Sequence, residues 1–77
     1  MHLDIITPDK VIFSGEITLV QLPGMDGLFE VLKNHAPMIA ALKKGAAKVE
    51  VDGGNQFFEI NGGIVEVLND KVLVLAE

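Results

Sequence analysis

The 77-residue sequence contains no cysteine and no arginine. Without cysteine the chain has no disulfide framework, no thiolate nucleophile and no cysteine-ligated metal. Small secreted domains often need disulfides, so this absence favours a reducing compartment. Arginine is the side chain best suited to grip phosphate or carboxylate groups, and its absence argues against a nucleotide site.

Positive charge is scarce throughout the chain. Six lysines stand against eleven acids, which gives a formal net charge of −5, and only Lys43 and Lys44 are adjacent. Proteins bind nucleic acids through clusters of basic side chains that displace counterions from the phosphates. We therefore expect no nucleic-acid partner.

Long apolar runs are also missing. No uncharged stretch approaches the ~20 residues that span a bilayer, and Asp4 and Asp9 interrupt the region where a signal peptide would be apolar. We expect no direct bilayer insertion, so that any membrane association goes through another protein. Hydrophobic residues nevertheless make up 49% of the chain. A domain this small has limited interior, and apolar area left outside indicates a partner.

Residues that could carry catalysis or hold a metal are few and scattered. His2 and His35 lack the close spacing of metal ligands, and the only serine, Ser14, has no Gly-x-Ser-x-Gly setting. The acids are spread out rather than paired as acid/base catalysis requires, and the glycines of residues 24–27 and 62–63 match no phosphate-binding loop. The sequence therefore predicts no catalytic, cofactor-binding or metal site, and His35 is interpreted as a loop histidine bonded to backbone.

Short runs of β-branched residues and leucine alternate with turn residues, which predicts an all-β sandwich or barrel. We expect a break at Ser14-Gly15, which suggests a bulge or corner, and turns at residues 23–24, 52–55, 61–63 and 69–70, where Gly, Asn and Asp tolerate tight-turn geometry. Residues 72–76 are apolar on both faces, which predicts a central strand between two layers. The apolar runs cover residues 3–7, 11–13, 17–22, 49–51, 57–60, 64–68 and 72–76.

Residues 37–45 are an exception, because they favour a two-turn helix when considered locally. Pro37 suits the first helical position, Lys43 and Lys44 suit the C-terminal end of the helix dipole, and Gly45 suits the position after it. Two turns are marginal without tertiary support.

Asp70-Lys71, at a predicted hairpin, suggests an alternative function. Lipoyl and biotinyl carrier domains are small all-β sandwiches that display a modified lysine at a hairpin tip. Here Lys71 leads directly into the apolar run 72–75 and is interpreted as the first residue of a strand. A free-standing carrier or binding module remains the alternative.

Several segments match one known family in the right order. They are residues 2–8, 13–17, 20–24 with Gly27, 34–39 with Leu42 and Gly45, 61–67 and 72–77. The most specific is Asn34-His35-Ala36-Pro37-Met38-Ile39. Together they resemble the N-terminal domain of the epsilon subunit of F-type ATP synthases, which is called delta in mitochondria, and the resemblance covers the whole chain.

The resemblance implies a single domain, residues 1–77, with a flattened two-sheet β-sandwich of roughly eight to ten short strands and no substantial helix. Residues 35–37 would then lead into a strand, and tertiary context would override the local helix preference after them. The implied function is that of a non-catalytic central-stalk subunit that links the gamma subunit to the c-ring. It would couple proton translocation to ATP synthesis at the cytoplasmic face of a bacterial inner membrane, as a peripheral part of the complex.

The family's contact regions can be carried over residue by residue. Members of this family often have an acidic residue at the position of Leu28. In this chain Asp26 or Glu30 would have to take the place of that acid. The chain ends at Glu77, where most relatives continue into a helical hairpin that binds ATP in some of them, so we expect a short form without ATP binding. The c-ring contact candidates are Gly24, Met25, Asp26, Gly27, Leu28 and Phe29, and the gamma contact candidates are His35, Ala36 and Pro37.

Overall fold

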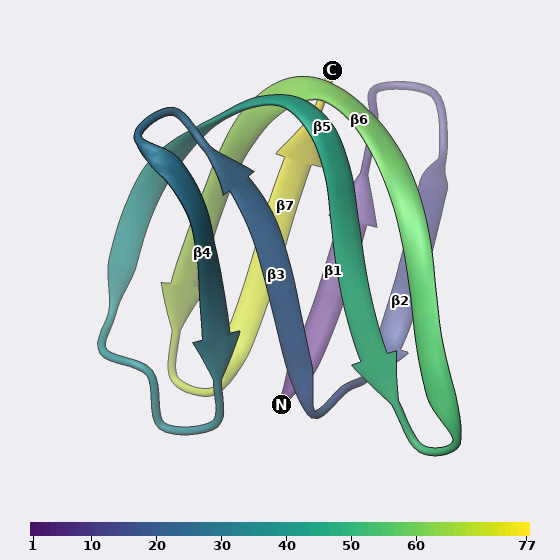
Figure 1. Ribbon diagram of the computed structural model, residues 1–77, viewed down its shortest axis with the longest axis vertical. Coiled ribbons are helices and arrows are strands. Elements are labelled where there is room, and N and C mark those ends of the chain that lie inside the picture. Colours follow the sequence, from purple (N-terminus) through teal and green to yellow (C-terminus); the bar gives the residue numbers. More distant parts are fainter.

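Seven β-strands and no helix make up the computed structural model, which describes residues 1–77 (Figure 1). The all-β prediction is confirmed. With no helix present, none is long and apolar enough to cross a membrane. The strands are β1 (His2–Ile6), β2 (Val11–Glu16), β3 (Leu19–Gly24), β4 (Gly27–Leu32), β5 (Met38–Val51), β6 (Gly54–Leu68) and β7 (Lys71–Ala76).

All seven strands belong to one hydrogen-bonded sheet with the order β2-β1-β7-β6-β5-β3-β4. Every neighbouring pair is antiparallel except β1 and β7, which run parallel. The long strands β5 and β6 arch over the top of the molecule and belong to both layers of the sandwich (Figure 1). The structure therefore keeps the expected sandwich but has seven strands in one folded sheet, rather than eight to ten strands in two sheets.

The strand number is lower than expected because of Asn61-Gly62-Gly63, where the sequence predicts a turn between two strands. The chain does not reverse there, because Gly62 and Gly63 take positive φ angles of 120° and 142° and let β6 bend while its pairing continues. In the neighbouring strand, the turn of the sheet brings Gly45 against Pro23, and a Cβ at Gly45 would lie 2.9 Å from the Pro23 Cβ. Glycine is needed where another residue approaches the backbone this closely.

The expected break at Ser14-Gly15 is also wrong. Strand β2 continues through both residues, with Leu3 paired to Gly15 and Asp4 to Ser14. The irregularity lies earlier in β2, where the partners of Ile5 and Ile6 are Phe13 and Val11 and Ile12 is left as an extra residue.

Four other local predictions are confirmed. Strand β3 ends at Gly24, and tight turns join β5 to β6 at Asp52-Gly53 and β6 to β7 at Asn69-Asp70. The residues after Pro37 form the start of β5, so tertiary pairing defeats the local helix preference. Pairing with β6 along the whole of β5 supplies hydrogen bonds that an isolated two-turn helix could not match in stability.

The core lies between the two layers and is entirely apolar. No polar or charged residue is buried, and no buried side-chain nitrogen or oxygen lacks a partner. Full burial of a Val, Leu or Ile side chain contributes about 1.5–3 kcal/mol, so this cluster supplies the main favourable term in stability. The fifteen residues of this hydrophobic core are Leu3, Ile5, Ile17, Val20, Leu22, Val31, Leu42, Ala47, Val49, Ile60, Val65, Val67, Val72, Val74 and Ala76.

Candidate interaction surface

The outer side of the sheet carries a broad exposed apolar surface. Ile6 pairs with Leu75, and Leu75 pairs with Ile64, so these three side chains lie side by side on one face. Leu68 lies four residues after Ile64 in β6 and therefore points the same way. Ile39 pairs with Glu66, an exposed acid that lies between Ile64 and Leu68, so Ile39 and Glu66 belong to the same face. Ile39 is 72% exposed, and Ile64, Leu68 and Leu75 are each about half exposed. We call Ile6, Ile39, Ile64, Leu68 and Leu75 the outer apolar face.

This surface corrects the prediction for the last strand. Strand β7 does lie inside the sheet, between β1 and β6. Its inner side chains, Val72 and Val74, are buried, but Leu75 on the opposite side is 47% exposed. Strand β7 is therefore apolar on both faces because one face packs in the core and the other is open to a partner.

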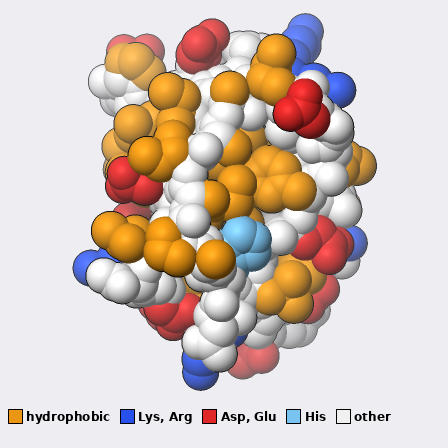
Figure 2. All heavy atoms as spheres, turned by 90° about the vertical axis from the view of Figure 1, so that its left-hand side faces the viewer, with side chains coloured by type: hydrophobic (Ala, Val, Ile, Leu, Met, Phe, Trp, Pro, Cys, Tyr) orange, Lys and Arg blue, Asp and Glu red, His pale blue; other side chains and the backbone are white.

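A second apolar feature is a groove of about 490 Å³ between the β3–β4 turn and the start of β5. It is lined by residues 24–29 from the turn and 38–41 from β5. Met25 and Leu28 at its edge are 60% and 67% exposed. Figure 2 looks at the side of the molecule that carries β4 and the start of β5, and it shows hydrophobic side chains gathered there with acidic ones around them.

The c-ring candidates all line this groove. Gly24 ends β3, Met25 and Asp26 form the turn, and Gly27 begins β4. Leu28 and Phe29 follow within that strand.

The gamma candidates His35, Ala36 and Pro37 lie in the exposed loop between β4 and β5. The His35 Nδ1–H donates to the Ala36 carbonyl oxygen over 2.7 Å, which confirms the interpretation of His35 as a loop histidine bonded to backbone. Pro37 lines a smaller cavity of about 370 Å³ together with Ile39 and the end of β6. The two candidate sets therefore lie near the start of β5, one at the groove and one in the loop that leads into the strand.

The residues that sequence reasoning missed are Ile39, Ile64 and Leu75. Ile64 and Leu75 belong to apolar runs, and Ile39 lies in the segment with a local helix preference, so none of the three is marked as exposed by its neighbours in sequence. Strand register decides which side of the sheet each side chain faces, so only the pairing of β5, β6, β7 and β1 could show that these three share an exposed face.

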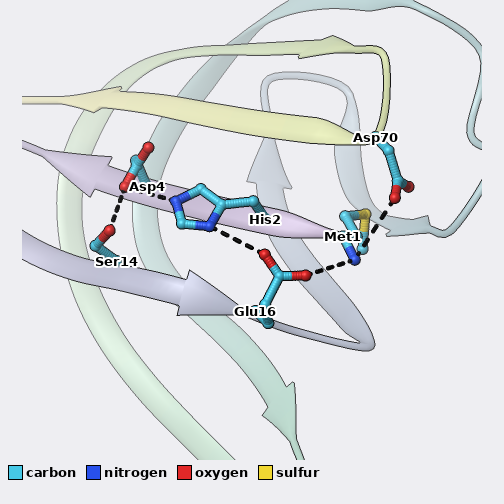
Figure 3. Close-up of polar contacts among 6 residues, drawn as sticks. All are labelled: Met1, His2, Asp4, Ser14, Glu16 and Asp70. Carbon is cyan, nitrogen blue, oxygen red and sulfur yellow. Dashed lines mark hydrogen bonds and ion pairs between the residues drawn. The ribbon is translucent and has the colours of Figure 1, made fainter.

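A polar network at the other end of β1 joins β1 to β2 and to the β6–β7 turn (Figure 3). The His2 ring nitrogens lie 3.1 Å from Glu16 Oε2 and 3.2 Å from Asp4 Oδ1. The Met1 ammonium donates to Glu16 Oε1 over 3.3 Å and lies 3.7 Å from Asp70. The Ser14 hydroxyl donates to Asp4 Oδ1 over 2.6 Å.

Two pKa values in this network are shifted. The hydrogen bond from Ser14 holds the pKa of Asp4 below its usual value, with His2 adding to the effect. Hydrogen bonds from His2 and then from the Met1 ammonium lower the pKa of Glu16. Hydrogen bonds that favour the charged form of a carboxyl group have this direction. The Ser14 hydroxyl of β2 donates to Asp4 of β1, and the Met1 ammonium beside β1 donates to Glu16 of β2, so the network holds the start of β1 against β2.

No group of three or more His, Asp and Glu side chains converges into a possible metal site. Lys71 is the first residue of β7, as predicted, and pairs with Leu68 and His2 rather than standing at a free hairpin tip.

The comparisons with known proteins agree with this geometry. Residues 1–77 match the family model described as ATP synthase, Delta/Epsilon chain, beta-sandwich domain. The chain belongs to this ATP synthase delta/epsilon family. Membership identifies it with a non-catalytic subunit, which confirms the prediction that it is not an enzyme.

Curated relatives of the delta/epsilon family are similar over nearly the whole chain. The ATP synthase epsilon chain of Chlorobium limicola is 49% identical over 76 residues, which cover 97% of this chain and 86% of the relative. That of Desulforamulus reducens is 47% identical over 78 residues, covering 99% of this chain and 58% of the relative. The chain thus spans most of the first relative but little more than half of the second.

Two solved structures share the fold. A chain of the Euglena gracilis mitochondrial ATP synthase superposes with a TM-score of 0.89 at 23% identity, over 96% of this chain and 48% of that one. A chain in the central stalk and c-ring of the Tetrahymena thermophila mitochondrial ATP synthase gives 0.74 at 19% identity, over 96% and 62%. These likenesses support the delta/epsilon sandwich as the fold.

Proposed function

We propose that this chain is a central-stalk subunit of an F-type ATP synthase that joins the gamma subunit to the c-ring. It transmits rotation driven by proton flow to the shaft and performs no bond chemistry. Its place is peripheral, at the cytoplasmic face of a bacterial inner membrane, held there by the rest of the complex. The family match over residues 1–77 supports this proposal.

The observation that carries the proposal is the outer apolar face. Large apolar side chains that gather on one exposed face, with polar residues around them, commonly mark protein interfaces. We assign this face, together with His35, Ala36 and Pro37, to the gamma subunit. The exposed β3–β4 turn, residues 24–29, is assigned to the c-ring, and the groove between this turn and the start of β5 is assigned to the gamma subunit.

Binding of the cognate gamma subunit tests the proposal. Wild-type chain and gamma should co-elute as a one-to-one complex in size-exclusion chromatography. Ile64→Lys places a charge in the middle of the outer apolar face, and we expect it to weaken binding by at least about tenfold, because an unpaired charge inside an apolar interface loses its hydration.

Phe57→Lys is the matched control. Phe57 is 65% exposed but lies in the other half of β6, outside the outer apolar face, so this variant should bind as the wild type does. Circular dichroism of both variants checks the fold. A wild-type chain that forms no complex, or an Ile64→Lys variant that binds gamma unchanged, would contradict the proposal.

A further inference from the structure

Strand β4 is an edge of the sheet, because it pairs with β3 alone. A two-residue turn joins these strands, and Gly24 and Gly27 are the pair that closes it. In an antiparallel ladder the hydrogen-bonded pairs alternate, so the backbones of Phe29 and Val31 face β3. The N–H and C=O groups of Leu28 and Glu30 then face the open side.

The open side of β4 has few internal partners. Of the residues that face it, Leu32 uses its carbonyl oxygen to accept from the His35 N–H over 3.1 Å. Neither Leu28 nor Glu30 makes a backbone hydrogen bond outside the strand ladder. The edge therefore offers donors and acceptors in the alternating order that an added strand requires.

Strand β4 also lacks the devices that usually keep an edge unpaired. Proteins protect edges with lysines, prolines or bulges, and β4 contains none of these, with Glu30 as its only charged residue. At the opposite edge, a bulge interrupts the pairing of β2 with β1. Strand β4 is therefore the better template for an incoming strand.

The groove beside β4 indicates the chemistry of such a strand. The Met25 N–H donates to the Ala41 carbonyl oxygen over 3.1 Å, which closes the groove at the turn. Beyond that contact, the exposed Met25, Leu28 and Ile39 offer apolar area. The nearby acids are Asp26, which lines the groove, and Glu30 on β4. An extended segment with apolar side chains at alternate positions and a basic residue opposite Glu30 matches this combination.

We propose that β4 is a docking edge, onto which an extended segment of the gamma subunit adds as a further strand of the sheet. The inference rests on the proposed function for the identity of the partner, and it adds the way in which part of that partner binds. Main-chain hydrogen bonds to Leu28 and Glu30 hold the segment, and the groove receives its apolar side chains.

Amide hydrogen exchange followed by NMR tests this directly, with the cognate gamma subunit as the probe. In the free chain the Leu28 and Glu30 amides should exchange quickly, while those of Phe29 and Val31 are protected by β3. In the complex with gamma we expect the exchange of the Leu28 and Glu30 amides to slow at least about tenfold, because strand addition protects alternate amides.

A matched pair of variants separates the backbone from the side chain. Glu30→Pro and Glu30→Ala both remove the carboxylate, but only proline removes the outward N–H, and proline is tolerated where an edge N–H faces solvent. We expect Glu30→Pro to weaken gamma binding at least about tenfold more than Glu30→Ala. Thermal unfolding of both variants checks that the fold is kept.

Each outcome decides between the alternatives. A wild-type chain that does not bind gamma overturns the proposed function, and this inference with it. A complex in which the Leu28 and Glu30 amides remain unprotected, or in which the two variants bind equally, overturns the inference alone. Protection that appears with rising concentration of the chain by itself assigns the edge to a second copy, which also contradicts the partner segment.

Discussion

At the scale of single residues, the ionised carboxylates of Asp4 and Glu16 stabilise the fold. The folded state lowers both pKa values. A lowered folded pKa means that the stabilisation is present above the unfolded pKa and is lost as pH falls through the folded value. The ordinary values are 3.8 for Asp and 4.5 for Glu, so the loss occurs in acid and leaves neutral pH unaffected. Both carboxylates are accessible to water, so the effect on stability is small.

Ser14→Ala tests the main cause of the Asp4 shift. Removing the hydroxyl that donates over 2.6 Å should raise the pKa of Asp4 toward 3.8, because the ionised form loses its strongest hydrogen bond. An NMR titration of the side-chain carboxyl carbons measures it, and Glu16 in the same sample serves as the internal control. If the pKa of Asp4 does not move, His2 rather than Ser14 controls that carboxylate.

At the scale of elements, the bend of β6 decides how the sheet folds over the core. Gly63 pairs with Leu42 on one side and Ala76 on the other. A Cβ there would collide with the Leu75 carbonyl oxygen and lie 3.0 Å from the Ala76 Cα. Both neighbours are backbone, so neither can give way without moving a strand.

Gly63→Ala is therefore expected to reduce the free energy of unfolding by about 3 kcal/mol or more, from backbone strain and overpacking together. Gly53→Ala is the matched control, because Gly53 also has a positive φ, 89°, but a Cβ at that position would meet no other atom within 4 Å. Strain alone should cost the control about 1 kcal/mol. Urea unfolding compares the two, and equal losses would mean that the close approach at Gly63 relaxes.

At the scale of the whole molecule, the outer apolar face and the open edge of β4 remain exposed while the net charge of −5 keeps copies of the chain apart. Charge far from zero keeps proteins soluble and monomeric. The isoelectric point is about 4.8, so this repulsion vanishes in mild acid.

We expect light scattering to show self-association near pH 4.8 that is absent near neutral pH. Leu75→Gln removes apolar area from the outer face without changing charge, and it should reduce the association. If the chain stays monomeric at its isoelectric point, the outer apolar face does not drive self-association.

Several features could be predicted from the sequence because they depend on neighbouring residues. Strand propensity indicated an all-β chain, and Asn69-Asp70 indicated a tight turn, where both residues adopt positive φ angles of 50° and 64°. The segment around His35 and Pro37 indicated the family, which the comparison confirmed.

Local signals failed where the outcome depended on distant strands. Glycines at 62–63 are compatible with either a turn or a bend, and the continued pairing of β6 with β5 and β7 selected the bend. The preference of residues 38–44 for a helix yielded to the same pairing.

The sequence by itself determined the β class, the tight turns and the family, because propensity, turn chemistry and motif order are properties of the chain in one dimension. Only the tertiary structure decided that Ile39, Ile64 and Leu75 share an exposed face and that β4 ends the sheet. The physical reason is that register and strand order arise from hydrogen bonds between segments far apart in sequence, and these bonds determine which apolar residues are buried and which are left for a partner.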